Sequence, residues 1–367
     1  MPSNFRLMRT ENPKIEQWKL LGQYAYPTNI RKYLNDRGFN NVDNRLIEFI
    51  VGCVRQSEAY FTAAENSPLD ISPLLSYYGT VNLLAAAYVM VTGCKPEIKT
   101  HGMRLLPLDD KDTKIADAKV KPINPQYGAL QLFCNALSGN CQMGGVPWTV
   151  EEILGSIPDL KKIFESCYPN AITYTIPVET LRKQRVIFER IDPKELARYN
   201  KPEDVFKIII GLSSAYLEPQ YSGQMEYIVL HRKIGGNEIG IYSIFGQKYL
   251  QVAHLKNNKL LNPSDLIVMF MGLFAFGYLS RYYPEIWNPF VRSDETGEKL
   301  VVEGFLQICQ RYLPNLVLGL IYGERVQFIN ESEKILDISS LEKTHGPSRL
   351  YEALEVRLPD SETLDEY

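Results

Sequence analysis

The apolar positions of the first hundred residues repeat with the spacing of buried helices. In residues 43–66 apolar side chains recur three and four positions apart, which predicts a helix with one buried face. Residues 72–93, "SPLLSYYGTVNLLAAAYVMVTG", are apolar nearly throughout and end at a glycine. Ser72 is a suitable N-cap, and Pro73 a suitable first helical residue. The pattern predicts a buried helical hairpin.

The period of the pattern changes after residue 170. Six segments alternate β-branched or aromatic residues with polar ones, which predicts an antiparallel β region. They are "AITYTIPVE", "RVIFERI", "FKIIIGLS", "MEYIVLHRK", "EIGIYSIFG" and "KYLQVAHL". A Gly-Gly-Asn turn in "KIGGNEIG" is suited to joining two of these strands. Helical spacing returns in residues 262–287 and 298–323.

This order of elements predicts an α+β fold with a mainly helical core and an inserted antiparallel β module. We expect an N-terminal helical region over residues 1–125, and short helices with the β module over 126–260. A C-terminal helical region over 261–330 should pack on the first, and an acidic tail follows over 331–367. Thr149 and Glu152 have the spacing of a capping box at the start of a short helix.

The most apolar segments are too short or too polar to predict a membrane span. The longest run without charge or strong polarity, Leu266–Leu279, has 14 residues, whereas a spanning helix needs roughly 18. The 72–93 segment is interrupted by tyrosine, threonine, serine and asparagine side chains. We therefore expect Ser72–Thr92 and Ser264–Leu279 to be buried core helices that pack together, and no membrane association.

Composition favours a soluble protein of the cytoplasm. The chain is 45% hydrophobic and 23% charged, as is usual for globular proteins. Its net charge of −3 excludes a global basic field, so nucleic-acid binding would need a local patch. The 23 tyrosines favour interfaces. The six cysteines lack zinc-ligand spacing, and we expect buried free thiols, no metal and no cofactor. The N-terminus is polar and has no apolar run, so we expect no secretion signal.

Polar residues on the predicted hairpin are the first candidates for a site. Tyr78 and Asn82 are four positions apart and share a helix face, and a buried amide must be hydrogen-bonded. Asn82 therefore either bonds a neighbouring backbone or faces a ligand. Arg55 and Glu58 are three positions apart on the preceding helix. They form either a buried ion pair or part of an anion site, with Arg55 pointing into a partly dry interior.

Two further candidates follow apolar helices. His101, in "KTHGMR", is either an acid or base near neutral pH or a structural side chain. Arg281 and Tyr282, in "LSRYYPEIW", place a cation beside aromatic rings, as Arg55 and Tyr77 do earlier. They favour cation–π contact or base stacking, or they only end a helix. No GxGxxG, GxxxxGK[ST], HExxH or GxSxG motif occurs, so the sequence does not indicate those enzyme classes.

Two passages carry a family resemblance. "ISPLLSYYGTVNLLAAAYVMVTG" followed by "THGM", and "FMGLFAFGYLSRYYPEIW", resemble the YaaC family of bacterial proteins. "RQSEAYFTAAE" and "PWTVEEILGSIPDL" fit the same order, so the resemblance spans residues 15–325. The YaaC resemblance implies little chemistry by itself.

A Tyr-Tyr-containing apolar helix, a glycine and a later histidine are also similar to the HEPN helical superfamily. That likeness implies a helical bundle that dimerises, often in toxin–antitoxin, CRISPR or antiphage systems, and in some members a ribonuclease. Tyr77, Tyr78 and His101 fall on the patterned positions. Catalytic members resemble one another in an Arg four to six residues before a His, and none of the four histidines here has one.

We therefore expect a non-catalytic interaction or regulatory protein on an HEPN-like scaffold, in a bacterial antiviral defence assembly. Its partner would be another protein or a second copy of the chain. The alternative is a metal-independent enzyme that processes RNA or nucleotides. Its site would combine Arg55, Glu58, Asn82, His101 and Arg281 between the two helical regions. Convergence of these side chains in one pocket would favour the enzyme.

Overall fold

The computed structural model describes residues 5–39, 42–108, 114–123, 128–138, 143, 145–183, 186–199, 202–221, 227–233 and 239–329. The chain divides into two compact units, Met1–Arg6 with Lys14–Gln327, and Leu7–Pro13 with Phe328–Tyr367. Everything that bears on a site below lies in the first unit. The predicted acidic tail and the Gly-Gly-Asn turn lie outside the described residues.

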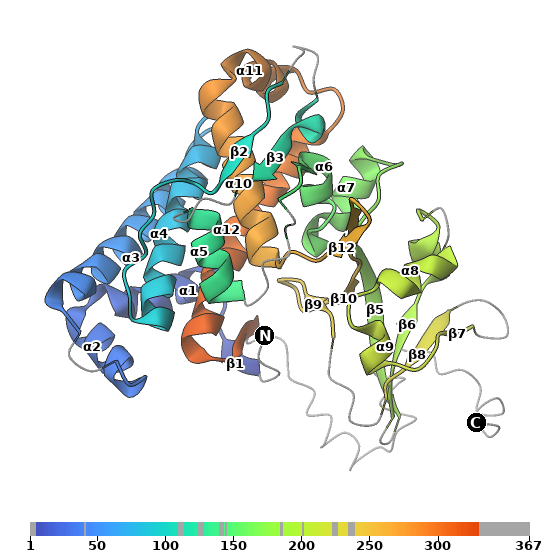
Figure 1. Ribbon diagram of the computed structural model, residues 1–367, viewed down its shortest axis with the longest axis horizontal. Helices are drawn as coiled ribbons and strands as arrows, with labels where there is room; N and C mark the ends of the chain where they lie inside the picture. Colours follow the sequence, from blue (N-terminus) through green and yellow to red (C-terminus); the bar gives the residue numbers. More distant parts are fainter. Residues whose placement is uncertain are drawn as a thin grey trace. The chain divides into compact units, whose positions relative to one another are not determined.

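Helices and strands follow one another in an α+β order (Figure 1). The helices are α1 (Pro13–Gly22), η1 (Gln23–Ala25), α2 (Pro27–Asp36), α3 (Asn44–Glu65), α4 (Ser72–Thr92), η2 (Ile115–Asp117), α5 (Ala129–Phe133), the π-helical η3 (Cys134–Ser138), α6 (Val150–Leu154), η4 (Pro158–Leu160), α7 (Lys161–Cys167), η5 (Pro193–Leu196), α8 (Pro202–Ile208), α9 (Leu212–Ala215), α10 (Asp265–Tyr282), α11 (Pro284–Ser293) and α12 (Glu298–Tyr322). The strands are β1 (Phe5–Arg9), β2 (Met103–Leu105), β3 (Lys119–Pro122), β4 (Trp148–Thr149), β5 (Thr175–Lys183), β6 (Val186–Ile191), β7 (Gln220–Tyr221), β8 (Ile228–His231), β9 (Ile241–Tyr242), β10 (Lys248–Gln251), β11 (His254–Lys256), β12 (Lys259–Leu261) and β13 (Arg325–Ile329).

The helical hairpin forms as the sequence predicts, from α3 and α4. The Asp43 carboxylate caps α3 by accepting the Arg45 N–H, and α4 ends at Gly93, whose φ is 70°. Ser72 differs from its predicted capping role, because its buried hydroxyl donates to the Ala64 carbonyl oxygen at 2.8 Å. That bond ties the start of α4 to the end of α3.

Helices α4 and α10 pack against each other, which confirms the predicted contact between the two apolar segments. A Cβ built at Gly277 of α10 would lie 3.4 Å from the Leu74 Cα of α4. The Tyr77 and Phe270 rings stack with centroids 5.4 Å apart. Both helices are long and apolar enough to cross a membrane, yet 61% and 78% of their most apolar windows are buried. Burial of this extent is that of core helices.

The β module is built around a six-stranded antiparallel sheet in the order β7-β8-β6-β5-β10-β9. The segment "FKIIIGLS", residues 206–213, was expected to be a strand of this sheet, and that prediction is wrong. It contributes to α8 and α9 instead, whose apolar side chains pack into the core of the module. Ile209 and Leu212 are 5% and 6% exposed. Packing on the sheet decides the conformation here, over the β-branched composition.

A small three-stranded sheet, β2-β3-β4, lies beside α10 (Figure 1). Its apolar side chains Met103, Leu105, Val120 and Trp148 are at most 7% exposed, so one face is buried. The other face carries basic side chains.

The cysteines depart in part from the expected buried free thiols. Cys53 and Cys309 are free and buried, but Cys94 is exposed and Cys167 is partly exposed. Cys134, at the start of η3, is disulfide-bonded, so the prediction that every thiol is free is wrong.

Candidate functional site

His101 and Tyr77 form a hydrogen-bonded pair between the loop before β2 and helix α4. Tyr77 Oη lies 2.7 Å from His101 Nδ1. Both rings also contact the Phe274 ring of α10, with centroids 5.9 and 5.5 Å away. Gly102 turns the chain directly after His101 with a φ of 76°, and a Cβ there would overlap the Gln131 side chain. The glycine therefore sets the bend that brings the imidazole to Tyr77.

The protonation states of this pair follow from burial. Tyr77 is 3% exposed, and burial raises the pKa of its phenol far above the usual value, so the phenol stays protonated. The pKa of His101 is lowered, first by desolvation and then by the charge of Arg281. A neutral imidazole accepts the phenol hydrogen on Nδ1 and carries its own hydrogen on Nε2. His101 is exposed as a residue and presents this donor at the surface.

Arg281, near the end of α10, contacts tyrosine side chains of both α4 and α10. Its Nη1 donates to Tyr78 Oη at 3.3 Å, and its Cζ lies 5.0 Å from the Tyr282 ring centroid. The Tyr60 ring of α3 contacts Tyr78, and the Tyr278 ring contacts Tyr282, with centroids 6.0 and 4.6 Å apart. We call these five side chains the Tyr–Arg surface: Tyr60, Tyr78, Tyr278, Arg281 and Tyr282. Arg281 and Tyr282 are exposed, the latter by 53%.

Asn82 makes a hydrogen bond within helix α4. Its Nδ2 donates to the Tyr78 carbonyl oxygen at 3.0 Å, four residues earlier in α4. The side chain is partly exposed. A hydrogen bond to the backbone is one of the two alternatives that the sequence leaves open.

Arg55 and Glu58 correct a prediction. Both are exposed, whereas Arg55 was expected to point into a partly dry interior and pair with Glu58. The Arg55 Nη2 instead donates to the Ala25 carbonyl oxygen of η1 at 3.3 Å. The buried face of α3 is lined by Cys53, Val54 and Ser57. The structure thus brings together Tyr77, Tyr78, His101, Arg281 and Tyr282. The Arg55 side chain contacts η1 instead.

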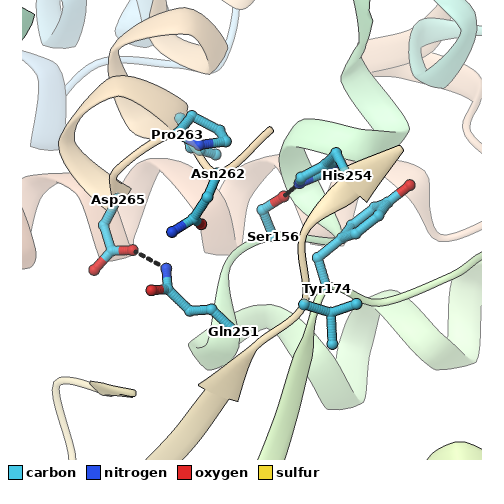
Figure 2. Close-up of a pocket in the computed structure, with 9 residues that line it drawn as sticks. Ser156, Tyr174, Gln251, His254, Asn262, Pro263 and Asp265 are labelled. Carbon is cyan, nitrogen blue, oxygen red and sulfur yellow. Dashed lines mark hydrogen bonds between the residues drawn. The ribbon is translucent and has the colours of Figure 1, made fainter. Parts of the chain in front are cut away.

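A second group of polar side chains encloses a small pocket where α6 and α10 meet the β module (Figure 2). The cavity has about 10 Å³ of space, enough for a single water molecule. Its polar lining comes from Ser156, Tyr174, Gln251, His254, Asn262 and Asp265. His254 Nε2 lies 3.0 Å from Ser156 Oγ, and the Tyr174 ring stacks on the imidazole with centroids 3.5 Å apart.

The Ser156–His254 pair lacks the hydrogen-bond direction of a nucleophilic dyad. Ser156 Oγ donates to the Glu152 carbonyl oxygen at 2.7 Å, so it accepts from His254 Nε2. Burial, helped by Lys256, lowers the pKa of His254 to about 3, so the imidazole is neutral. Its Nδ1 has no hydrogen-bond partner among the described atoms. A catalytic serine needs the opposite arrangement, in which the hydroxyl hydrogen points to the histidine.

Asp265 completes the polar lining of this pocket. It accepts from Tyr312 Oη at 2.8 Å and from Gln251 Nε2 at 3.3 Å. Burial raises the pKa of its carboxyl group. The arrangement is typical of a structural carboxylate satisfied by neutral donors.

Comparison with known proteins assigns the chain to a family. A family model described as YaaC-like protein matches residues 11–321. The chain belongs to the YaaC-like family. Neither the curated proteins nor the solved structures give a match to it. The YaaC-like match covers both polar groups and the sequence passages that carry the resemblance, while an HEPN-like arrangement of the helices stays a prediction.

Within this YaaC-like chain, sequence reasoning missed the enclosed pocket. His254 has no metal-ligand spacing to another histidine in the sequence, and Ser156, Tyr174 and Asp265 belong to no motif. Four separate elements and loops supply these side chains, so no local signal could have found them. Among the described residues, no group of three or more His, Cys, Asp or Glu side chains is placed to hold a metal ion.

Proposed function

We propose that this YaaC-like protein is a non-catalytic interaction protein, and that the Tyr–Arg surface binds a protein partner, with a second copy of the chain as the first to test. The observation that carries this is Arg281, which lies exposed between Tyr78 and Tyr282. Tyr and Arg are the side chains that most often dominate binding energy at interfaces. An arginine held by a phenol and a ring is ordered before a partner arrives, which reduces the entropy lost on binding.

The HEPN resemblance supplies the context of the proposal. Proteins of that superfamily are helical bundles that dimerise, and many serve antiphage systems. We therefore propose an HEPN-like scaffold in a bacterial antiviral defence assembly of the cytoplasm. The superfamily analogy is what supports this context.

The oligomeric state in solution tests the surface. We expect the purified protein to dimerise with rising concentration in light scattering, and the Arg281→Ala/Tyr282→Ala variant to dissociate at least about tenfold more readily, as loss of a central hot spot does. Arg292→Ala is the matched control, since Arg292 is an exposed arginine of the neighbouring helix α11. A dimer unaffected by the double change would contradict this interface.

The alternative, an RNA- or nucleotide-processing enzyme, is favoured by one observation. The charge of Arg281 acts on His101, so an arginine and a histidine distant in sequence lie near each other. We expect purified protein to leave labelled single-stranded RNA uncut, because Tyr77 already holds His101 Nδ1. Cleavage that disappears in His101→Ala would establish the enzyme instead.

A further inference from the structure

The outer face of the β2-β3-β4 sheet is basic. In β2 the side chain between buried Met103 and Leu105 is Arg104, which is exposed. In β3 the outward positions are Lys119, exposed, and Lys121, partly exposed. Arg104 and Lys121 are direct cross-strand partners in the antiparallel ladder. We call these three residues the basic face.

The pairing of Arg104 with Lys121 is unfavourable by itself. Arg104 and Lys121 lie on neighbouring strands, which are about 4.8 Å apart. Lys119 and Lys121 are two residues apart on one strand, which is about 6.7 Å. Like charges directly opposite each other in a sheet destabilise it. None of the three cations has an ion-pair partner among the described residues. A fold that keeps such a pair is relieved of the repulsion when an anion lies across it.

Beyond the protein partner proposed above, we infer that the basic face binds the phosphate backbone of a nucleic acid. Phosphates are bound by Lys and Arg without any need for apolar contact. A protein partner would instead need an apolar centre at the interface, and the apolar side chains of this sheet all point to the buried side. The chain has a net charge of −3, so only a local basic face of this kind could attract a polyanion.

Neighbouring carboxylates limit where the phosphates lie. Asp117 precedes Lys119 by two residues, and Glu151 follows Thr149, the cross-strand partner of Lys119. Both reduce the potential at that end of β3. The Arg104–Lys121 pair is therefore the centre of the site. Residues 109–113, between β2 and β3, lie outside the described residues.

Fluorescence anisotropy with a labelled oligouridylate tests the inference on the full-length protein. For three phosphate contacts on a single strand, the logarithm of the binding constant should fall with the logarithm of salt concentration with a slope of about −2. The Arg104→Gln/Lys119→Gln/Lys121→Gln variant should bind at least about tenfold more weakly and with a much flatter slope. Removing the repulsion should leave its melting temperature at or above that of the unchanged protein.

A matched control distinguishes binding at the basic face from attraction by the overall charge of the protein. Lys32→Gln/Lys162→Gln/Lys194→Gln makes the same change in net charge at exposed positions of α2, α7 and η5. This control should bind the oligonucleotide as the unchanged protein does. Equal weakening of both triple variants, or no binding at low salt, would overturn the inference. Poly-glutamate that competes as well as unlabelled oligouridylate would also overturn it, in favour of an acidic protein. None of these results depends on the Tyr–Arg surface.

Discussion

Two histidines in this protein each share a hydrogen bond with a hydroxyl group, and they differ in which partner donates. At the surface, the Tyr77 phenol donates to His101 Nδ1, which leaves the Nε2 hydrogen for an incoming group. In the pocket, His254 Nε2 donates to Ser156, which leaves the Nδ1 lone pair without a hydrogen-bond partner among the described atoms. Both imidazoles are held neutral.

The difference lies in how completely each ring is enclosed. His254 is 3% exposed, and its ring contacts those of Trp148 and Tyr174. His101 is exposed at the end of a loop. The same side chain is thus enclosed in one place and open to solvent in the other, and no property of the two histidines as residues separates them.

The largest contrast should appear in stability. His254→Ala removes a ring packed on two aromatic neighbours, and we expect a loss of about 2–4 kcal/mol in the free energy of unfolding. His101→Ala should lose less than about 1 kcal/mol, because its ring is only partly covered. Urea denaturation of both variants measures the difference. Equal losses would show that the loop carrying His101 is as tightly packed as the pocket.

A smaller contrast should appear in the pH dependence of stability. The pKa of His254 is lowered from 6.5 to about 3, so between these values the unfolded chain binds more protons than the fold. Its contribution makes the free energy of unfolding rise with pH across this window, by about 1.4 kcal/mol per pH unit, and fall as the medium becomes acidic. His101 should contribute in the same direction and by less.

The contribution of His254 is obtained by subtracting the free energy of unfolding of His254→Phe from that of the unchanged protein at each pH. Asp159 acts in the opposite direction, since burial raises its pKa from 3.8 to about 6 and the fold then binds more protons than the unfolded chain. That contribution is common to both proteins and cancels in the difference. We expect the pH slopes from urea denaturation to diverge below pH 6.5. Parallel slopes would mean that His254 is solvated in the fold.

The smallest effect concerns Arg281. Its positive charge lowers the pKa of His101, so Arg281→Gln should raise that pKa, while the distant His254 should keep its own value. Titration of the imidazole proton signals by NMR follows both rings in one sample. Arg292→Gln provides a control of equal charge change. A shift of similar size in the control would mean that net charge, and not the neighbouring guanidinium, sets the pKa of His101.

The sequence predicts those parts of the fold in which the apolar pattern of a single helix already shows that the helix is buried. Helices α3, α4 and α10 have this property, and their pairing follows from it. Residues 206–213 show the limit. Their β-branched composition fits a strand, but the central strands of the sheet are already paired, and the segment packs on the module as helices. No pattern within residues 206–213 indicates that the segment will be helical.

The candidate site was predictable where residues share an element and a face. Tyr77 and Tyr78 both lie on α4, and Tyr77 contacts both His101 and the Tyr78 ring. The prediction for Arg55 is wrong for a geometric reason. At 100° per residue, Arg55 lies about 140° around the helix from buried Ile50. Being near apolar residues in sequence does not place a side chain among them. The contact between Arg281 and Tyr78 joins residues 203 positions apart, which only the fold reveals.

The pairing of α4 with α10 also has a consequence during synthesis. Helix α4 ends at Thr92 and α10 begins at Asp265, so 173 residues (265 − 92) separate the emergence of one helix from that of the partner that covers it. At about 5–20 residues per second, the ribosome leaves the apolar surface of α4 uncovered for roughly 10–35 s. We therefore expect the α3–α4 hairpin of the nascent chain to need protection from aggregation until α10 is synthesised.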